Sequence, residues 1–209
     1  MKSNIILSRE EAGKLLSWGG EQNPGPWTDH CKVVARAAET IAHKCGLDTE
    51  RAYVFGLLHD IGYYAYRDRK GKTSHIYTGY ELMTQKGCDD IARICLSHSF
   101  PYPCKDIKAL SSFDANWTDE GLLVINAFLS ETTYDDYDKL IQLCDCLGTA
   151  QGVVVIEKRL MDVTKRHGFN DFTIKKWGAF FSLKEYFDKT CGMNIYNLFC
   201  DEIKADIFG

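Results

Sequence analysis

The sequence lacks three features that mark common protein classes: long apolar runs, an excess of positive charge and paired Cys-x-x-Cys motifs. The apolar run at residues 5–7 is too short for a signal-peptide core, and no stretch approaches the roughly 18 apolar residues of a membrane helix. The formal net charge of −4 argues against a broad nucleic-acid footprint, which is normally basic. We therefore expect a cytoplasmic protein that binds neither a membrane nor a nucleic-acid polymer.

Cysteine is abundant, but its pattern does not indicate disulfides. The nine cysteines are odd in number and scattered, which predicts reduced thiols in a reducing compartment. Cys144 and Cys146 flank Asp145 and raise the alternative of a zinc-thiolate site. A single intervening residue is not the usual spacing of such a site, and no second pair complements it. We interpret these cysteines as small apolar residues of helices.

Helix signals recur along the chain, whereas an alternating strand pattern, internal repeats and low-complexity regions are missing. Ser8 followed by Glu11 is typical of a capping box. The expected helices run from Ser8 to Gly19-Gly20, from Thr28 or Asp29 to about Cys45 with Gly46 as a left-handed stop, from Asp48 to Gly62, from about His75 to Gly87, from Asp89 or Asp90 to His98, from Thr118 through Leu129, from Tyr137 to Gly148, from Val153 to His167, from about Thr173 to Cys191 and from Asn194 to Ile207. Residues 153–156 alone could form a strand. The pattern predicts an all-α protein with one compact domain.

Six polar residues interrupt the apolar faces of these expected helices. They are His30, His59, Asp60, His75, His98 and Asp145. A single buried histidine is usually a hydrogen-bonded core residue, so none of the six is informative alone. Together they include two carboxylates without an obvious buried Lys or Arg partner, and these would repel each other unless divalent cations offset their charge. Imidazole and carboxylate ligands without thiolate suit iron, manganese, zinc, nickel or cobalt.

The order of these residues resembles that of the HD superfamily of metal-dependent phosphohydrolases. The segments that carry the resemblance are His30, Leu58-His59-Asp60-Ile61-Gly62, His75-Ile76-Tyr77-Thr78-Gly79, Leu96-Ser97-His98-Ser99 and Leu143-Cys144-Asp145. They are most similar to small bacterial HD hydrolases with two metals, which include the symmetrical cleavers of dinucleoside tetraphosphates. The resemblance implies a helical bundle with an HD core at residues 28–150, an N-terminal helix and turn at 1–27, and C-terminal helices at 151–209 that pack on the core.

The resemblance also implies roles for the six residues. His30, His59, Asp60 and Asp145 would hold one metal ion, and Asp60 would bridge to a second ion held by His75 and His98. Asp60 and His59 would be the catalytic residues. Two ions, of iron, manganese or another transition metal, would lower the pKa of a bridging water and produce the hydroxide that attacks phosphorus. The expected substrate is a nucleotide or another small phosphate ester.

Phosphate recognition is less well defined by the sequence. The segment from Tyr63 to Ser74 carries four cations that could contact phosphates, Arg67, Arg69, Lys70 and Lys72, of which Lys72 is the first choice because it is nearest His75. A solvated loop explains these four residues equally well. Many relatives with two metals carry a lysine soon after the His-Asp-x-Gly turn, whereas Tyr63 and Tyr64 follow it here.

Two alternatives to a phosphohydrolase stay open, and this difference bears on the first of them. A branch of the superfamily with a similar set of six ligands consists of mixed-valent di-iron oxygenases, and a non-catalytic ligand-binding module could keep the same fold. The segment after residue 153 matches no functional pattern. Its aromatic residues are interpreted as core or as contacts of a homodimer; they are Trp177, Phe180, Phe181, Tyr186 and Phe187.

Overall fold

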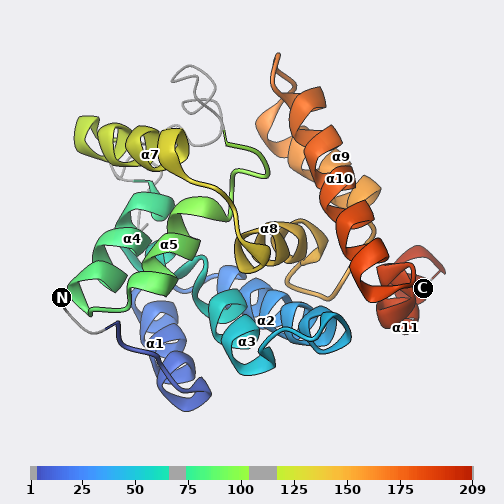
Figure 1. The fold of residues 1–209 in the computed structure, drawn as a ribbon, viewed down its shortest axis with the longest axis horizontal. Helices are drawn as coiled ribbons and strands as arrows, with labels where there is room; N and C mark the ends of the chain where they lie inside the picture. Colours follow the sequence, from blue (N-terminus) through green and yellow to red (C-terminus); the bar gives the residue numbers. More distant parts are fainter. Residues whose placement is uncertain (1–3, 66–73, 104–116, 209) are drawn as a thin grey trace.

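The computed structural model describes residues 4–65, 74–103 and 117–208, and these form an all-α fold (Figure 1). In chain order the elements are α1 (Arg9–Gln22), α2 (Trp27–Cys45), α3 (Thr49–Leu58), the 3-10 helix η1 (Ile61–Ala65), α4 (His75–Gln85), α5 (Asp89–Ser97), α7 (Asp119–Glu131), α8 (Asp136–Leu147), α9 (Ile156–His167), α10 (Thr173–Cys191), the 3-10 helix η2 (Ile195–Phe199) and α11 (Cys200–Phe208). Within these ranges β structure is limited to an isolated antiparallel bridge between Gly148 and Val153. The predicted all-α fold is confirmed.

The centre of the molecule is a close contact between α2 and α3. Ala35, Ala38 and Ala42 of α2 are fully buried, and a β-carbon on Gly56 of α3 would lie only 2.7 Å from Ala35 Cα. Small residues on both helices therefore let their backbones approach closely. This contact fixes the N-terminal end of α2 beside the C-terminal end of α3, where His30 and His59 lie.

The C-terminal helices share the main hydrophobic core with α2, α3 and α8. Their contribution to that cluster consists of Ile156, Leu160, Phe180, Leu183, Phe187, Ile195 and Phe199, all of them buried. Arg36 of α2 also donates two hydrogen bonds to the Glu202 carboxylate of α11, at 2.5 and 2.8 Å. A smaller second cluster joins α4, α5 and α7, and Phe172, just before α10, packs against it. The segment that joins α9 to α10 therefore extends from one cluster to the other.

Helix boundaries follow the local signals in some places and not in others. At α1 the Ser8 hydroxyl accepts a bond from Glu11 N, and the Glu11 carboxylate accepts one from Ser8 N, so the expected capping box is confirmed. Gly46 ends α2 in the left-handed region with φ of 71°. The expected start of that helix is wrong, because α2 begins at Trp27 after Pro26 and has no side-chain cap. Proline suits the start of a helix because it has no N–H to satisfy.

Three other expected elements differ from the structure. The helix capped by Asp48 ends at Leu58 instead of continuing to Gly62, and α9 begins at Ile156 instead of Val153. The last expected helix is divided into η2 and α11. Among the described residues, no helix has the length and apolar character needed to cross a membrane.

Candidate metal centre

All six polar residues that interrupt apolar helical faces converge on one place. His30 lies in the first turn of α2, His59 and Asp60 directly follow α3, His75 is the first residue of α4, His98 directly follows α5, and Asp145 lies in the last turn of α8. His59 and His98 are each 1% exposed, and the other four are mostly buried. Five segments thus bring their polar residues to a common centre at helix ends.

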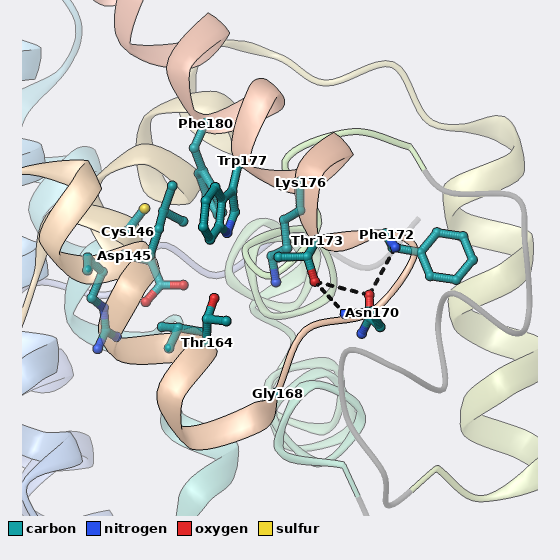
Figure 2. A pocket seen from close by; sticks show the side chains of 13 residues that line it. Asp145, Cys146, Thr164, Gly168, Asn170, Phe172, Thr173, Lys176, Trp177 and Phe180 are labelled. Atoms are coloured by element: carbon teal, nitrogen blue, oxygen red, sulfur yellow. Dashed lines mark hydrogen bonds between the residues drawn. The ribbon is translucent and has the colours of Figure 1, made fainter.

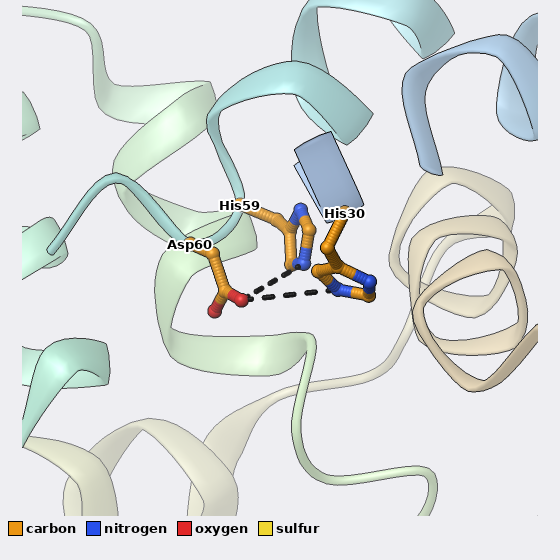
Figure 3. Close-up of side chains that lie close together, drawn as sticks. All are labelled: His30, His59 and Asp60. Atoms are coloured by element: carbon orange, nitrogen blue, oxygen red, sulfur yellow. Dashed lines mark ion pairs between the residues drawn. The ribbon is translucent and has the colours of Figure 1, made fainter. Parts of the chain in front are cut away.

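The carboxylate of Asp60 lies between two pairs of histidines. Its Oδ2 is 3.5 Å from His59 Nε2 and 3.9 Å from His30 Nε2. Figure 3 marks both pairs with dashed lines. Its Oδ1 is 3.3 Å from His75 Nε2 and 3.2 Å from His98 Nε2. Asp60 thus forms one group of three residues with His30 and His59, and another with His75 and His98. In each group the potential ligand atoms lie within 4.8 Å of one another. Asp60 would therefore be the ligand that the two groups share, because each of its oxygens faces a different pair of histidines.

Asp145 belongs to the first of these groups only. Its Oδ1 lies 3.0 Å from His30 Nε2 and 3.8 Å from His59 Nε2. The group on the side of His30 thus has two imidazoles and two carboxylates within reach. The group on the side of His75 has two imidazoles and the shared carboxylate.

Two of the imidazoles are oriented by backbone carbonyls. His59 Nδ1 is 2.7 Å from Gly56 O, and His98 Nδ1 is 2.9 Å from Cys95 O. A carbonyl can only accept, so each Nδ1 carries a proton, and in the neutral ring Nε2 then presents its lone pair to the centre. The ring of His75 is held differently, by stacking on Tyr63 with 4.3 Å between the ring centroids.

The histidines of the centre favour the ionised form of its two carboxylates. Burial alone would raise the pKa of Asp60, but His59, His75 and His98 outweigh it and hold that pKa well below its usual range. Asp145 behaves in the same way, with His30 and His59 as its partners. Burial opposes protonation of His59, yet Asp60 and Asp145 raise its pKa, whereas burial lowers the pKa of His98. Both carboxylates are thus ionised at neutral pH.

The donor set fits divalent transition-metal ions. His59 Nε2 is buried and has no hydrogen-bond partner among the described residues, which leaves a lone pair aimed into the centre. Two ligand atoms that each lie about 2 Å from one ion are themselves about 3 to 3.5 Å apart, similar to the N···O separations seen here.

Thiols do not contribute to this donor set. Cys144 and Cys146 are buried, and burial raises the pKa of both thiols, so neither is a thiolate at neutral pH. All cysteines in the described part of the chain are free. The structure therefore agrees with the interpretation of Cys144 and Cys146 as apolar helix residues.

The four cations expected to bind phosphate, Arg67, Arg69, Lys70 and Lys72, lie outside the described residues. Other cations lie beside the centre instead. A cleft of about 950 Å³ is lined by His30, Asp60, His75, His98 and Asp145, and also by Arg159 of α9 and Lys176 of α10. Burial lowers the pKa of Lys176 to about 8, although Asp145 counteracts it. The C-terminal helices thus form one wall of the site.

The sequence pattern gave no signal for this wall. Arg159 and Lys176 each lie beside apolar residues of amphipathic helices, where a long cationic side chain is usually explained by its stem covering the apolar face. Only the packing of α9 and α10 on the core shows that both residues line the cleft.

Comparison with known proteins agrees with this geometry. The family model described as HD domain matches residues 27–150, which is more than half of the 209 residues. The chain therefore belongs to the HD domain family, a family of the metal-dependent hydrolase type, and the resemblance seen in the sequence is confirmed. Neither the comparison with curated proteins nor the comparison with solved structures found a match.

Proposed function

We propose that this member of the HD domain family is a metal-dependent phosphohydrolase that acts on a small phosphate ester or anhydride, with a nucleotide as the first substrate to test. The observation that carries the proposal is the position of Asp60, whose two oxygens each face a separate pair of histidines. This arrangement suits two cations that share one carboxylate ligand. Such a pair of cations is typical of enzymes that displace groups at phosphorus.

In this proposal His30, His59, Asp60 and Asp145 hold one divalent cation, and Asp60, His75 and His98 hold the other. When bound, such a pair of cations acidifies water and neutralises charge on phosphoryl oxygens. Candidate metals are iron, manganese and other transition metals that accept nitrogen and oxygen ligands.

The residues of the chain contribute orientation and charge. The Gly56 and Cys95 carbonyls fix the rings of His59 and His98, so their Nε2 atoms need not reorient when a ligand arrives. Asp60 and Asp145 stay ionised and are available as ligands at neutral pH. Arg159 and Lys176 are close enough to the centre to attract a phosphate into the cleft. Asp60 and His59 are the residues whose loss would affect both metal and reaction most directly.

The decisive experiment combines elemental analysis with an activity screen. Wild type, the double variant His75→Ala with His98→Ala, and the control His43→Ala are analysed for metal content and assayed against nucleotides and simple phosphate esters. His43 is exposed in the last turn of α2, so its loss leaves the centre intact.

We expect about two ions per chain in wild type and in the control, and about one in the double variant. Phosphate release should fall by roughly 100-fold or more in the double variant. Metal-replete wild type that hydrolyses no member of the panel would contradict the proposed activity. No observation on the described residues favours a di-iron oxygenase or a non-catalytic module instead.

A further inference from the structure

A second pocket lies between α9 and α10 (Figure 2). It is smaller than the cleft and adjoins it. Its volume is about 180 Å³. It shares four lining residues with the cleft, namely Asp145, Arg159, Val163 and Lys176. Asp145 therefore belongs both to the candidate metal centre and to the lining of this pocket.

The lining of this pocket combines apolar and aromatic side chains with polar ones. Its apolar part comes from Leu160 and Val163 of α9 and from Trp177 and Phe180 of α10. In Figure 2 the side chains of Trp177 and Lys176 project from α10 into the same space that Asp145 and Thr164 border. Trp177 is only half-buried although it lies in the pocket wall, so part of its ring is available to a ligand.

Two cations, Arg159 and Lys176, lie beside the Asp145 carboxylate at the junction with the cleft. Arg159 is 19% exposed, and its Nη1 lies 3.9 Å from Asp162 Oδ2, too far for a hydrogen bond. Lys176 Nζ lies 5.9 Å from the centroid of the Phe180 ring. An anion at the junction would meet these two cations on the side away from Asp145, and the aromatic side chains of the pocket would lie directly behind it.

The size of the pocket limits what it can hold. An apolar cavity of about 150 Å³ is enough to bind benzene. A pocket of about 180 Å³ therefore suits one six-membered ring or a short branched chain, but not two fused rings.

We propose that this pocket binds the organic group of the substrate, a single ring or a group of similar size, while Lys176 and Arg159 hold the attached phosphate at the metal centre. The proposal rests on the proposed phosphohydrolase function and narrows its substrates from nucleotides and other phosphate esters to esters with a compact apolar group. Both helices lie outside residues 27–150, so the match to the family model does not include this pocket.

The test measures binding of phosphonates that cannot be hydrolysed as esters. Methylphosphonate, phenylphosphonate and 1-naphthylphosphonate are titrated calorimetrically into the full chain loaded with Mn²⁺. Phenylphosphonate should bind roughly tenfold or more tightly than methylphosphonate, because its ring is removed from water. 1-Naphthylphosphonate should show no gain over phenylphosphonate.

Three variants separate the pocket from the charges. Val163→Trp fills the pocket and should abolish the preference for phenyl over methyl. Trp177→Ala enlarges it and should make 1-naphthylphosphonate the tightest ligand. Lys176→Met should weaken phenyl- and methylphosphonate alike, by about tenfold, without changing their ratio. Lys175→Met is the matched control, because Lys175 is exposed and its Nζ lies over the Tyr102 ring, 4.5 Å from the centroid.

The outcomes distinguish this inference from the function on which it rests. Wild type that holds metal and hydrolyses phosphate esters, but binds phenyl- and methylphosphonate equally, would overturn the pocket assignment alone. An unchanged preference in both Val163→Trp and Trp177→Ala would overturn it as well. Wild type without phosphate-ester turnover and without phosphonate binding would overturn both.

Discussion

Gly62 and His75 meet backbone to backbone: a β-carbon on Gly62 would lie only 1.8 Å from the His75 carbonyl oxygen. The same β-carbon would lie 2.5 Å from Gly79 N, one turn further along α4. Gly62 is absent from the described residues with positive φ, so its lack of a side chain matters for space and not for backbone conformation. The glycine of the His-Asp-x-Gly turn thus lets the first turn of α4, and with it His75, approach Asp60.

We therefore expect Gly62→Ala to damage both the fold and the second half of the centre. The added methyl group cannot be accommodated by a side-chain movement, since its neighbours are backbone atoms. Stability should fall by about 3 kcal/mol, the upper part of the range for overpacked sites. Displacement of His75 should also reduce the metal content toward one ion per chain. Urea unfolding and elemental analysis measure the two effects.

Gly13→Ala provides the matched control for this change. Gly13 lies inside α1 and has nothing within 4 Å of the position of an added β-carbon. Alanine there should stabilise the protein by about 0.5–1 kcal/mol, because glycine loses more conformational freedom in a helix. Equal stability changes of the same sign in Gly62→Ala and Gly13→Ala would refute the role assigned to Gly62.

The sequence predicted the helices well where the signals were local. The capping residues Ser8, Asp48 and Thr118, and the left-handed Gly46, act within one helical turn, and the structure confirms each of them. It also indicated which six polar residues deserved attention, because each interrupts an apolar face. The structure brings the six together, and their role as ligands stays a prediction.

What the sequence could not predict depends on contacts between distant segments. Gly62 was expected to stop a helix, whereas α3 ends at Leu58 and Gly62 serves the approach of α4. Lys176 and Arg159 carried no signal because their position beside Asp145 arises only when α9 and α10 pack on the core. Periodicity shows that a helix has an apolar face but not which helix it meets.

Asp60 and Asp145 should differ in how many ions they support. Asp60 faces both histidine groups, whereas Asp145 faces only His30 and His59. Asp60→Asn should therefore remove most bound metal, and Asp145→Asn should lower the content by about one ion per chain. Elemental analysis of the two isosteric variants, purified in parallel, compares their metal content per chain. A larger loss in Asp145→Asn than in Asp60→Asn would rule out Asp60 as the shared ligand.

Removal of metal should lower the stability of the folded chain. The ligands come from five separate segments, so an ion that binds the assembled centre stabilises the native state by mass action. At about 100 times its Kd, each such ion contributes roughly 2.7 kcal/mol. Thermal unfolding with and without a chelator should show a clear decrease in Tm, reversed when Mn²⁺ is restored. The control is Asp60→Asn, in which the chelator should change Tm little. A chelator effect of wild-type size in that variant would contradict the assignment.

The ion pair of Arg93 and Asp138 should make stability depend on pH. Asp138 is fully buried, and Arg93 Nε donates to its Oδ2 at 3.1 Å, which ties α5 to α8. Burial raises the pKa of Asp138 and Arg93 opposes that rise, so Arg93→Met should raise this pKa further. A carboxyl with a raised folded pKa binds its proton more tightly when folded, and its unfavourable contribution is lost as pH falls through that pKa. Arg93→Met should thus lower the free energy of unfolding by about 3 kcal/mol at pH 8 and by clearly less at pH 5, measured by urea unfolding.

Lys14→Met is the control, because it breaks the exposed pair with Glu10. It should lower the free energy of unfolding by less than about 1 kcal/mol at either pH. A loss in Arg93→Met that is the same at both pH values would show that Asp138 does not titrate in this range.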